Sequence, residues 1–504
     1  MSDPIRSIII VGGGTAGWMA AAGLAKLLPA ESVKITLVES EAIGTIGVGE
    51  ATIPHIRYFN NLLGLNENEF VRKTNATFKL GIEFNNWGRQ GDSYIHPFGP
   101  YGVNMDGVHF HHFWLRHQQQ TQANNLDDYN MQILAARAGK FDRILKDSQG
   151  RPQGKLDYAF HFDANLYAKF MREFSEARGV KRIEGKVIEV NQHSENGFVK
   201  SITLDDEQTL EADLFIDCSG FRGLLIEQTL KTGYEDWSSV LPCNRAVAQG
   251  CAKVGAPIPY TKATAKPVGW QWRIPLQSRT GNGYVYCSDF IGDDEAQASL
   301  AEALDGEATS EPNFIKFVTG IRNKTWNKNV ISLGLAAGFL EPLESTSIHL
   351  IQSAVARLMT NFPNKKFSQV DIDYFNKRTR LEYEQIRDFL ILHYNATSRD
   401  DNEFWQLCRN IELPDTLKER VEIYKENARL YRHDNELFNE TSWFVVLNGQ
   451  NIIPKHYHPM AGYVDEAILN QRLKELRTAF DQFCNNMPSH QSFIDVNCKA
   501  ELSN

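Results

Sequence analysis

The chain has 504 residues, of which 42% are hydrophobic and 23% charged, so it can bury a large core. Lys and Arg number 53 against 62 Asp and Glu, a net charge of −9 with no basic tail, which argues against a nucleic-acid-binding protein. No apolar run is long enough to span a bilayer, and the N-terminal M-S-D-P-I-R-S does not resemble a signal peptide. We therefore expect a cytoplasmic globular protein that has no membrane partner.

The N-terminal segment has the pattern of a dinucleotide-binding unit. Residues 7–11, S-I-I-I-V, are typical of a buried parallel strand. An Ala-rich helical pattern follows over 18–28, and a second strand over 33–38 ends at Glu39. Between the first strand and the helix lies a G-x-G-x-x-G fingerprint, made of Gly12, Gly13, Gly14, Thr15, Ala16 and Gly17.

Each part of this unit has a separate mechanical role. Gly12 permits a tight turn, Gly14 lets the backbone approach a pyrophosphate, and Gly17 allows close packing of helix on sheet. The helix N-terminus supplies N–H groups for the anion. Glu39 is placed to accept a hydrogen bond from a ribose hydroxyl, and it disfavours the 2′-phosphate of NADP. The alternative is a glycine-rich turn that serves packing alone.

The N-terminal dinucleotide-binding unit by itself does not show whether the cofactor is FAD or NAD. Residues 44–54 add glycines where the chain could pass close to an extended cofactor, around Gly47, Val48 and Gly49. Strand-plus-glycine runs recur at 212–223 and 330–338. Segments dispersed this widely favour an FAD domain assembled from distant parts.

The seven cysteines are scattered and odd in number, with no C-x-x-C pair. This pattern favours reduced thiols over disulfides or a zinc site. The cysteines are Cys218, Cys243, Cys251, Cys287, Cys408, Cys484 and Cys498.

Six motifs occur in order over most of the chain. They are G-G-G-T-A-G-W at 12–18, G-V-G-E-A-T-I-P at 47–54, F-K-L-G-I at 78–82, W-Q-W-R-I-P at 270–275, E-P-L-E-S-T-S at 341–347 and R-D-F-L-I-L-H-Y at 387–394. In these motifs the chain resembles a flavin-dependent halogenase of the tryptophan halogenase family. The W-x-W-x-I-P element is the most specific of them.

The resemblance implies an α/β fold in which a Rossmann-type FAD domain, like that of flavin monooxygenases, carries a mainly helical C-terminal region. We place the FAD-binding halogenase core at 1–365, with substrate-pocket segments near 75–115, and the helical region at 366–504. Val187 and Leu335 join the fingerprint residues as expected FAD contacts. The sequence shows only one dinucleotide fingerprint, so we expect a separate flavin reductase to supply FADH2 without a stable complex. The oligomeric state stays open, with a homodimer as one candidate.

Lys79 lies in the apolar segment T-F-K-L-G-I-E-F, where a buried ammonium is costly. From the residues alone, the simpler interpretation is a lysine whose charged end reaches solvent from the edge of an element. The resemblance implies instead that Lys79 is catalytic, at the end of a tunnel from the flavin. There it hydrogen-bonds hypohalous acid or is halogenated by it to a haloamine.

Glu344 matches the second catalytic residue of the family. Aromatic substitution builds positive charge on the ring, which a nearby carboxylate can stabilise, and the carboxylate can also accept the ring proton. The alternative is that Glu341 and Glu344 only approach a helix N-terminus, since S-T-S before the apolar Ile348 is typical of a helix start.

The resemblance also assigns residues around the flavin. Backbone N–H groups of Thr346 and Ser347 are expected to bind chloride or bromide. The family commonly has glycine at the second position, so the Cβ of Ser347 leaves halide affinity open. Trp270 and Trp272 would share one face of a strand, either in ordinary packing or as a barrier that keeps substrate from the flavin.

The expected substrate pocket is aromatic. His96, Pro97 and Phe98 resemble the His-x-Phe pair that holds indole between two aromatic faces. Phe438 and Trp443 both fall near another expected aromatic wall, and the sequence does not choose between them. A histidine cluster of His109, His111, His112 and His117 has no carboxylate partner in sequence, so we predict no metal site there.

Three segments of the C-terminal region have helical spacing of apolar residues, at 368–394, about 413–431 and 464–483, with a polar break at 395–402. Together with the resemblance, they predict an enzyme that uses FADH2, O2 and halide to chlorinate or brominate an electron-rich aromatic, such as indole or tryptophan. An FAD-dependent aromatic hydroxylase and a non-catalytic flavin-binding protein are the alternatives.

Overall fold

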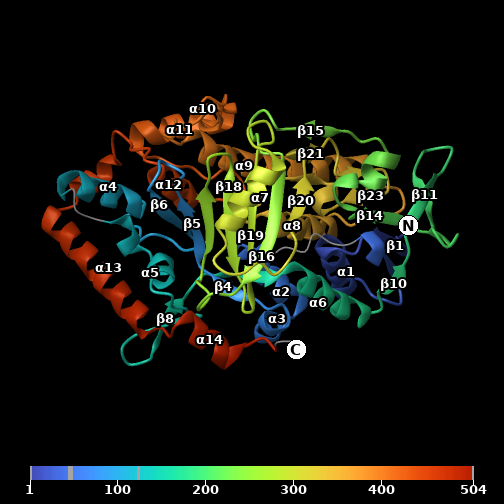
Figure 1. Ribbon diagram of the computed structural model, residues 1–504, viewed down its shortest axis with the longest axis horizontal. Coiled ribbons are helices and arrows are strands. Elements are labelled where there is room, and N and C mark those ends of the chain that lie inside the picture. The colour runs from blue at the N-terminus through green and yellow to red at the C-terminus, as the bar shows by residue number, and fades with distance from the viewer. Residues whose placement is uncertain (1–2, 44–48, 122–124, 502–504) are drawn as a thin grey trace.

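A computed structural model describes residues 3–43, 49–121 and 125–501 (Figure 1). The predicted contacts Gly47 and Val48 therefore lie outside the described residues. No described helix has both the length and the apolar character needed to cross a membrane.

The first layer is a six-stranded sheet whose first five strands run parallel, with α1 (Thr15–Leu27) following its central strand. The predicted strands at 7–11 and 33–38 are its β1 and β2, and the 212–223 and 330–338 runs supply β14 and β23. The order is β10 (Lys181–Glu184), β2 (Lys34–Glu39), β1 (Ser7–Val11), β14 (Leu214–Asp217), β23 (Val330–Ser332) and β22 (Trp326–Asn327). The isoleucine-rich β1 is buried on both faces, as a central parallel strand requires.

A second, seven-stranded sheet forms the centre of the molecule (Figure 1). Its neighbours are antiparallel, apart from the parallel pair of β17 and β5. The order is β20 (Asn313–Lys316), β16 (Arg245–Ala252), β19 (Arg279–Tyr286), β18 (Trp270–Pro275), β17 (Thr261–Ala265), β5 (Gly81–Asn85) and β6 (Ser93–Pro97).

Four small sheets hold the remaining strands. A three-stranded sheet carries Lys79 at the end of its third strand, and its order is β3 (Gly49–Ala51), β9 (Ala159–Asp163) and β4 (Thr77–Lys79). The other strands are β11 (Val187–Gln192), β12 (Val199–Leu204), β13 (Thr209–Glu211), β15 (Tyr234–Asp236), β21 (Gly320–Arg322), β24 (Gly338–Phe339), β7 (Ile144–Lys146) and β8 (Pro152–Lys155).

Helices surround the two main sheets, and α1 packs against α6 and α8 beside the parallel sheet. The helices before the C-terminal region are α2 (His55–Leu63), α3 (Glu67–Lys73), α4 (Phe110–Thr121), α5 (Met131–Arg137), α6 (Ala164–Glu176), α7 (Asp293–Glu302) and α8 (Ser347–Thr360).

Within the described residues, the chain after α8 forms helices and no strands. These elements are α9 (Gln369–Asn395), α10 (Glu403–Arg409), α11 (Asp415–Asn427), α12 (Glu440–Gly449), α13 (Glu466–Asn486) and α14 (His490–Asn497), with a short 3₁₀ turn at Pro459–Tyr463. Helix α12 packs on β6, and α10, α11 and α12 pack on α9. The three predicted helices correspond to α9, α11 and α13, and the α/β fold class is confirmed. The division at residue 365 stays a prediction.

Asp217, at the end of β14, organises the turn that follows this strand. One carboxylate oxygen accepts the backbone N–H groups of Leu225 and Ile226, each at 2.8 Å. The other accepts the backbone N–H and the hydroxyl of Ser219. Asp217, Leu225 and Ile226 are each 0% exposed, so the two N–H donors of Leu225 and Ile226 have no bulk water as a substitute.

We expect Asp217→Ala to lower the stability of the protein by on the order of 3 kcal/mol, because it leaves buried N–H donors without an acceptor. The measurement is the thermal unfolding midpoint without cofactor. Asp206→Ala, in an exposed turn, is the matched control and should leave the midpoint unchanged. Equal midpoints for the two variants would contradict the role given to Asp217.

Candidate active site

A cavity of about 650 Å³ extends from the first glycine turn to the 338–351 segment. Most of the predicted cofactor contacts line it, from both the N-terminal unit and later segments. Those that do are Gly12, Gly14, Thr15, Ala16, Glu39, Gly49, Val187 and Leu335. Gly17 does not line the cavity. A Cβ there would lie 1.8 Å from the carbonyl oxygen of Gly12, so Gly17 serves the close packing expected of it.

The glycine turn fits a dinucleotide pyrophosphate. Gly12 has a φ of +111°, and a Cβ there would lie 2.3 Å from the carbonyl oxygen of Cys218. A Cβ on Gly14 would meet no atom within 4 Å, so open space remains at the N-terminus of α1. Unpaired N–H groups at a helix N-terminus favour an anion in that space. These residues would hold the phosphates of FAD.

Glu39 lines the same cavity, but its carboxylate already has protein partners. One oxygen pairs with Arg182, and the other accepts the indole N–H of Trp18 at 3.3 Å. Arg172 lies 3.8 Å away. The expected hydrogen bond to a ribose hydroxyl would therefore share an acceptor that Arg182 and Trp18 hold in place, and it stays a prediction.

The other end of the cavity is lined by Trp270, Trp272, Ser345 and Ser347. The two tryptophans lie on one face of β18, as their spacing predicts. Gly283 on the neighbouring strand makes room for Trp272, because a Cβ at this glycine would lie 2.0 Å from the indole ring. The two indoles thus form a wall of the cavity.

Lys79 lies behind this end of the cavity and is 0% exposed. Its ammonium donates to the hydroxyl of Ser345 at 2.7 Å and to the carbonyl of Thr52 at 3.0 Å. It also lies 5.2 Å from the ring centre of Phe98. The surface-lysine interpretation is therefore wrong: the short strand β4 delivers Lys79 into the core. Ser345 joins the lysine to the cavity.

Burial lowers the pKa of Lys79 to about 7, although the Glu344 carboxylate favours the charged form. Near neutral pH this lysine can therefore exist both as a hydrogen-bond donor and as a nucleophilic amine.

Glu344 is 1% exposed and lies between two histidines. Its oxygens lie 2.9 and 3.1 Å from Nδ1 of His96, and His393 Nε2 is 2.8 Å from Oε1. Burial alone raises the pKa of this carboxyl, but the histidines outweigh burial and hold the pKa at about 2. Glu344 is therefore a carboxylate at any ordinary pH, and His393 is a site residue that the sequence reasoning missed.

His393 contacts both the backbone of its own helix and Glu344. Its Nδ1 lies 2.8 Å from the carbonyl oxygen of Phe389, which can only accept, so Nδ1 donates to it. Its Nε2 lies 2.8 Å from Oε1 of Glu344. Helix α9 therefore presents this ring to the Glu344 carboxylate.

Thr346 and Ser347 lie where α8 begins, as the S-T-S pattern predicts. The Thr346 hydroxyl is buried and has no partner among the described residues, which fits a small anion beside it. The left-handed conformation in this turn falls on Ser345, with φ 60°, and not on Ser347, the first residue of α8. The Cβ of Ser347 therefore meets no backbone constraint, and halide binding here stays a prediction.

Three of the aromatic residues predicted for the substrate pocket, His96, Phe438 and Trp443, gather around Phe389 on α9. The Phe438 ring stacks on Phe389 at 3.9 Å, and the Trp443 ring meets it edge-on at 4.8 Å. His96 lies 5.8 Å from Phe389 and 6.2 Å from Phe438, measured between ring centres. Both C-terminal candidates thus belong to this cluster, while Pro97 ends β6 beside His96. Their contact with substrate stays a prediction.

The histidine-rich segment near α4 is used for packing. His111 donates to the carbonyl oxygen of Ala428, and His112 accepts the backbone N–H of His458. Burial lowers the pKa of His111 to about 4 and that of His112 to about 2, so both rings are neutral. Among the described residues, no group of three or more His, Cys, Asp or Glu side chains could hold a metal ion.

The sequence profile of the tryptophan halogenase family matches residues 7–466. The chain belongs to this family. It is therefore a flavin-dependent halogenase, in agreement with the cavity and the buried lysine.

Similar proteins include a tryptophan 6-halogenase from Streptomyces toxytricini, 35% identical over 97% of each chain. A tryptophan 7-halogenase from Lentzea aerocolonigenes is 33% identical over 93% of each chain. Among solved structures, a flavin-dependent halogenase from Xanthomonas campestris is 44% identical, with a TM-score of 0.96 over 99% of this chain and 100% of that chain. One from Brevundimonas sp. BAL3 is 42% identical, with a TM-score of 0.93 over 97% of this chain and 99% of that chain.

The roles of Gly12 and Gly14 in this turn can be distinguished by experiment. We expect Gly12→Ala to lower the thermal midpoint of the cofactor-free protein, because φ +111° and a 2.3 Å contact both oppose a Cβ. We expect Gly14→Ala to leave that midpoint unchanged but to weaken FAD binding by about tenfold, measured by fluorescence titration, because its Cβ fills the pyrophosphate space. Unchanged FAD affinity in Gly14→Ala would show that the cofactor does not approach this turn.

Proposed function

We propose that this halogenase chlorinates or brominates indole or an indole derivative such as tryptophan, with Lys79 and Glu344 as its catalytic residues. The observation that carries the proposal is the convergence of two distant segments beside the cavity. Lys79 from β4 and Glu344 from the turn before α8 influence each other electrostatically inside the core. Ser345, next to Glu344, contacts Lys79 and also lines the cavity suited to FAD.

Reduced flavin, when bound, supplies with O2 the oxidising power that converts halide into hypohalous acid. We propose that Thr346 and Ser347 bind the halide at the N-terminus of α8, and that Trp270 and Trp272 bar the substrate from the flavin. Hypohalous acid that passes this wall meets Lys79. As an ammonium, Lys79 donates a hydrogen bond to it; as an amine, it attacks the halogen, so that an N–halogen bond forms and water leaves.

Glu344 acts on the aromatic ring. When the halogen adds to a ring carbon, positive charge spreads over the ring, and a fixed carboxylate stabilises this charge. Because its pKa is held at about 2, Glu344 is charged throughout the working range and does not depend on pH for this role. It is also placed to receive the ring proton.

The substrate class rests on the aromatic cluster and on the names of the relatives. His96, Phe98, Phe438 and Trp443 offer flat faces of the kind that hold an electron-rich ring. Two similar proteins are named as tryptophan 6- and 7-halogenases. We further propose that a separate flavin reductase in the cytoplasm supplies the FADH2.

The experiment that tests this proposal offers the protein indole, tryptophan or a larger indole-bearing molecule. Each is supplied with chloride and with bromide, in the presence of a flavin reductase. We expect products heavier by one halogen in place of one hydrogen, detected by mass spectrometry. Incorporation of oxygen in place of halogen would support an aromatic hydroxylase. Absence of any turnover would support a non-catalytic flavin-binding protein.

Lys79→Ala should abolish halogenated product while FAD binding persists, because Lys79 does not line the flavin cavity. Product is measured by mass spectrometry and FAD affinity by titration. Lys73→Ala, an exposed lysine on the preceding helix, is the matched control and should retain product formation. Product from Lys79→Ala at the wild-type level would remove Lys79 from the mechanism.

A further inference from the structure

The turn that carries Glu344 holds a second buried carboxylate, Glu341, which the mechanism above does not use. Glu341 is 0% exposed. Its Oε2 accepts two hydrogen bonds, from the indole N–H of Trp270 at 2.7 Å and from the hydroxyl of Tyr394 at 2.6 Å. Its Oε1 has no partner among the described residues.

A carboxylate in this place is costly. Burial raises the pKa of Glu341 to about 7, and the hydrogen bonds from Tyr394 and Trp270 only partly offset it. The titratable groups close enough to respond to it are Tyr394, Cys243 and Cys408, and none of them is a cation. An apolar side chain would fill the same volume without this cost. What Glu341 adds is one oxygen on which two short hydrogen bonds converge.

The indole N–H of Trp270 depends on this oxygen, whereas those of Trp87 and Trp405 bind backbone carbonyls. Trp87 donates to the backbone carbonyl of Ala263 at 3.0 Å, and Trp405 to that of Lys266 at 2.9 Å. Trp270, 6.5 Å from Trp87 between ring centres, donates to a side chain instead. Its orientation is therefore set by Glu341 and can be changed by one substitution.

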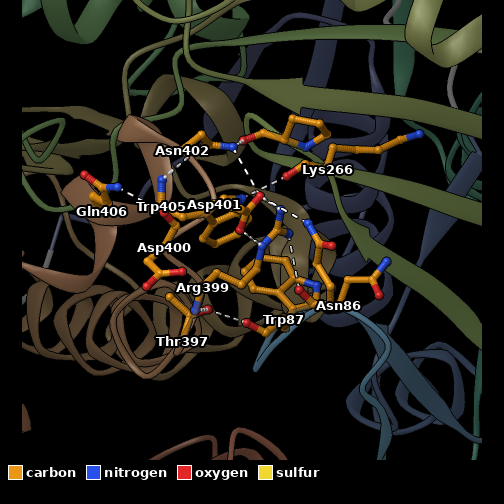
Figure 2. Close-up of polar contacts among 12 residues, drawn as sticks. Asn86, Trp87, Lys266, Thr397, Arg399, Asp400, Asp401, Asn402, Trp405 and Gln406 are labelled. Atoms are coloured by element: carbon orange, nitrogen blue, oxygen red, sulfur yellow. Dashed lines mark hydrogen bonds and ion pairs between the residues drawn. The ribbon is translucent and has the colours of Figure 1, made fainter.

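A polar network of Thr397, Arg399 and Asp401 lies around Trp87 and Trp405 (Figure 2). Arg399 forms a two-pronged pair with Asp401 at 2.9 and 2.8 Å and lies 4.4 Å from the ring centre of Trp405. Thr397 donates to the carbonyl of Trp87 at 2.6 Å, and the Trp405 ring stacks on Tyr394 at 6.1 Å. None of these contacts involves the indole N–H of Trp270, so the hydrogen bond to Glu341 can be removed without breaking them.

The geometry also relates this wall to the catalytic carboxylate. Glu341 and Glu344 lie at the two ends of one 3₁₀ turn, and they contact Tyr394 and His393, which are consecutive residues of α9. The turn thus holds Trp270 and Glu344 in a fixed relation to the same helix.

We propose that Glu341 is a positioning residue that locks Trp270 into the wall of the flavin cavity and so keeps the oxidised halogen on its way to Lys79. This inference rests on the proposed function of that site. If the wall opens, hypohalous acid escapes to solvent before it reaches the substrate.

The test measures coupling, defined as halogenated product formed per FADH2 oxidised, at saturating FAD. Escaped hypohalous acid is trapped with monochlorodimedone. Glu341→Leu removes the one oxygen that accepts both bonds, and we expect coupling to fall by about fivefold with a matching rise in trapped hypohalous acid. Glu341→Gln keeps an oxygen that can accept both bonds, so coupling should return to near the wild-type value.

Two further variants separate positioning from general stability. Trp270→Phe removes the donor of the first bond together with part of the ring that lines the cavity, and it should reproduce the loss of coupling. Tyr394→Phe removes the second bond, leaves Trp270 held, and should keep wild-type coupling even if it lowers the thermal midpoint. The proposal is overturned if Tyr394→Phe loses coupling as much as Trp270→Phe, or if folded Glu341→Leu keeps it.

A readout without turnover distinguishes failure of this inference from failure of the proposed function. In protein labelled with 5-fluorotryptophan, the ¹⁹F resonance of Trp270 is assigned by its absence in Trp270→Phe. We expect it to shift or broaden in Glu341→Leu but not in Tyr394→Phe, whether or not the enzyme halogenates any tested substrate. An unchanged resonance in Glu341→Leu overturns the positioning role, whereas absence of halogenated product in the wild type overturns only the proposed function.

Discussion

The structure depends on the burial of opposite charges around one turn. Lys79, Glu341 and Glu344 are all removed from water, and isolated charges in a protein interior are very costly. Each is therefore tied to a distant segment: Lys79 to Ser345, Glu344 to His96 and His393, and Glu341 to Trp270 and Tyr394. These ties bring β4, β6, β18 and α9 together at the segment between β24 and α8.

The same turn separates three environments that the chemistry must keep apart. On one side is the flavin cavity, reached by Ser345 and Ser347. On the other is the aromatic cluster around Phe389, which the histidines join to Glu344. Between them lies Lys79, whose amine is poised between its two protonation states because burial and Glu344 act in opposite directions. A short segment can serve all three because successive side chains of a tight turn point in different directions.

Part of this arrangement could be predicted from the residues. The glycine fingerprint requires a particular turn, so its place between β1 and α1 follows from local sequence. The alternation of Trp270 and Trp272 fixes them on one face of a strand. The partners of the charged groups could not be predicted in this way. No residue near Glu341 in the sequence indicates that its hydrogen-bond partners are Trp270 and Tyr394. His393 belongs to one of the family motifs, but the motif does not show that it contacts Glu344. The backbone conformation of Ser345 was also missed, since no local pattern shows which residue of S-T-S is left-handed.

The sequence by itself determined the family, the α/β class and the parallel sheet with its glycine turn, because these depend on short-range patterns and on motifs that keep their order along the chain. Only the tertiary structure decided the charge states at the site. The pKa of Lys79, of Glu341 and of Glu344 each follows from desolvation and from neighbours far away in sequence. The tertiary structure also decided that the 341–347 segment contacts both the cavity and the histidine next to the aromatic cluster. This requires α9, which carries His393 and Tyr394, to meet the same turn as Lys79 and Trp270.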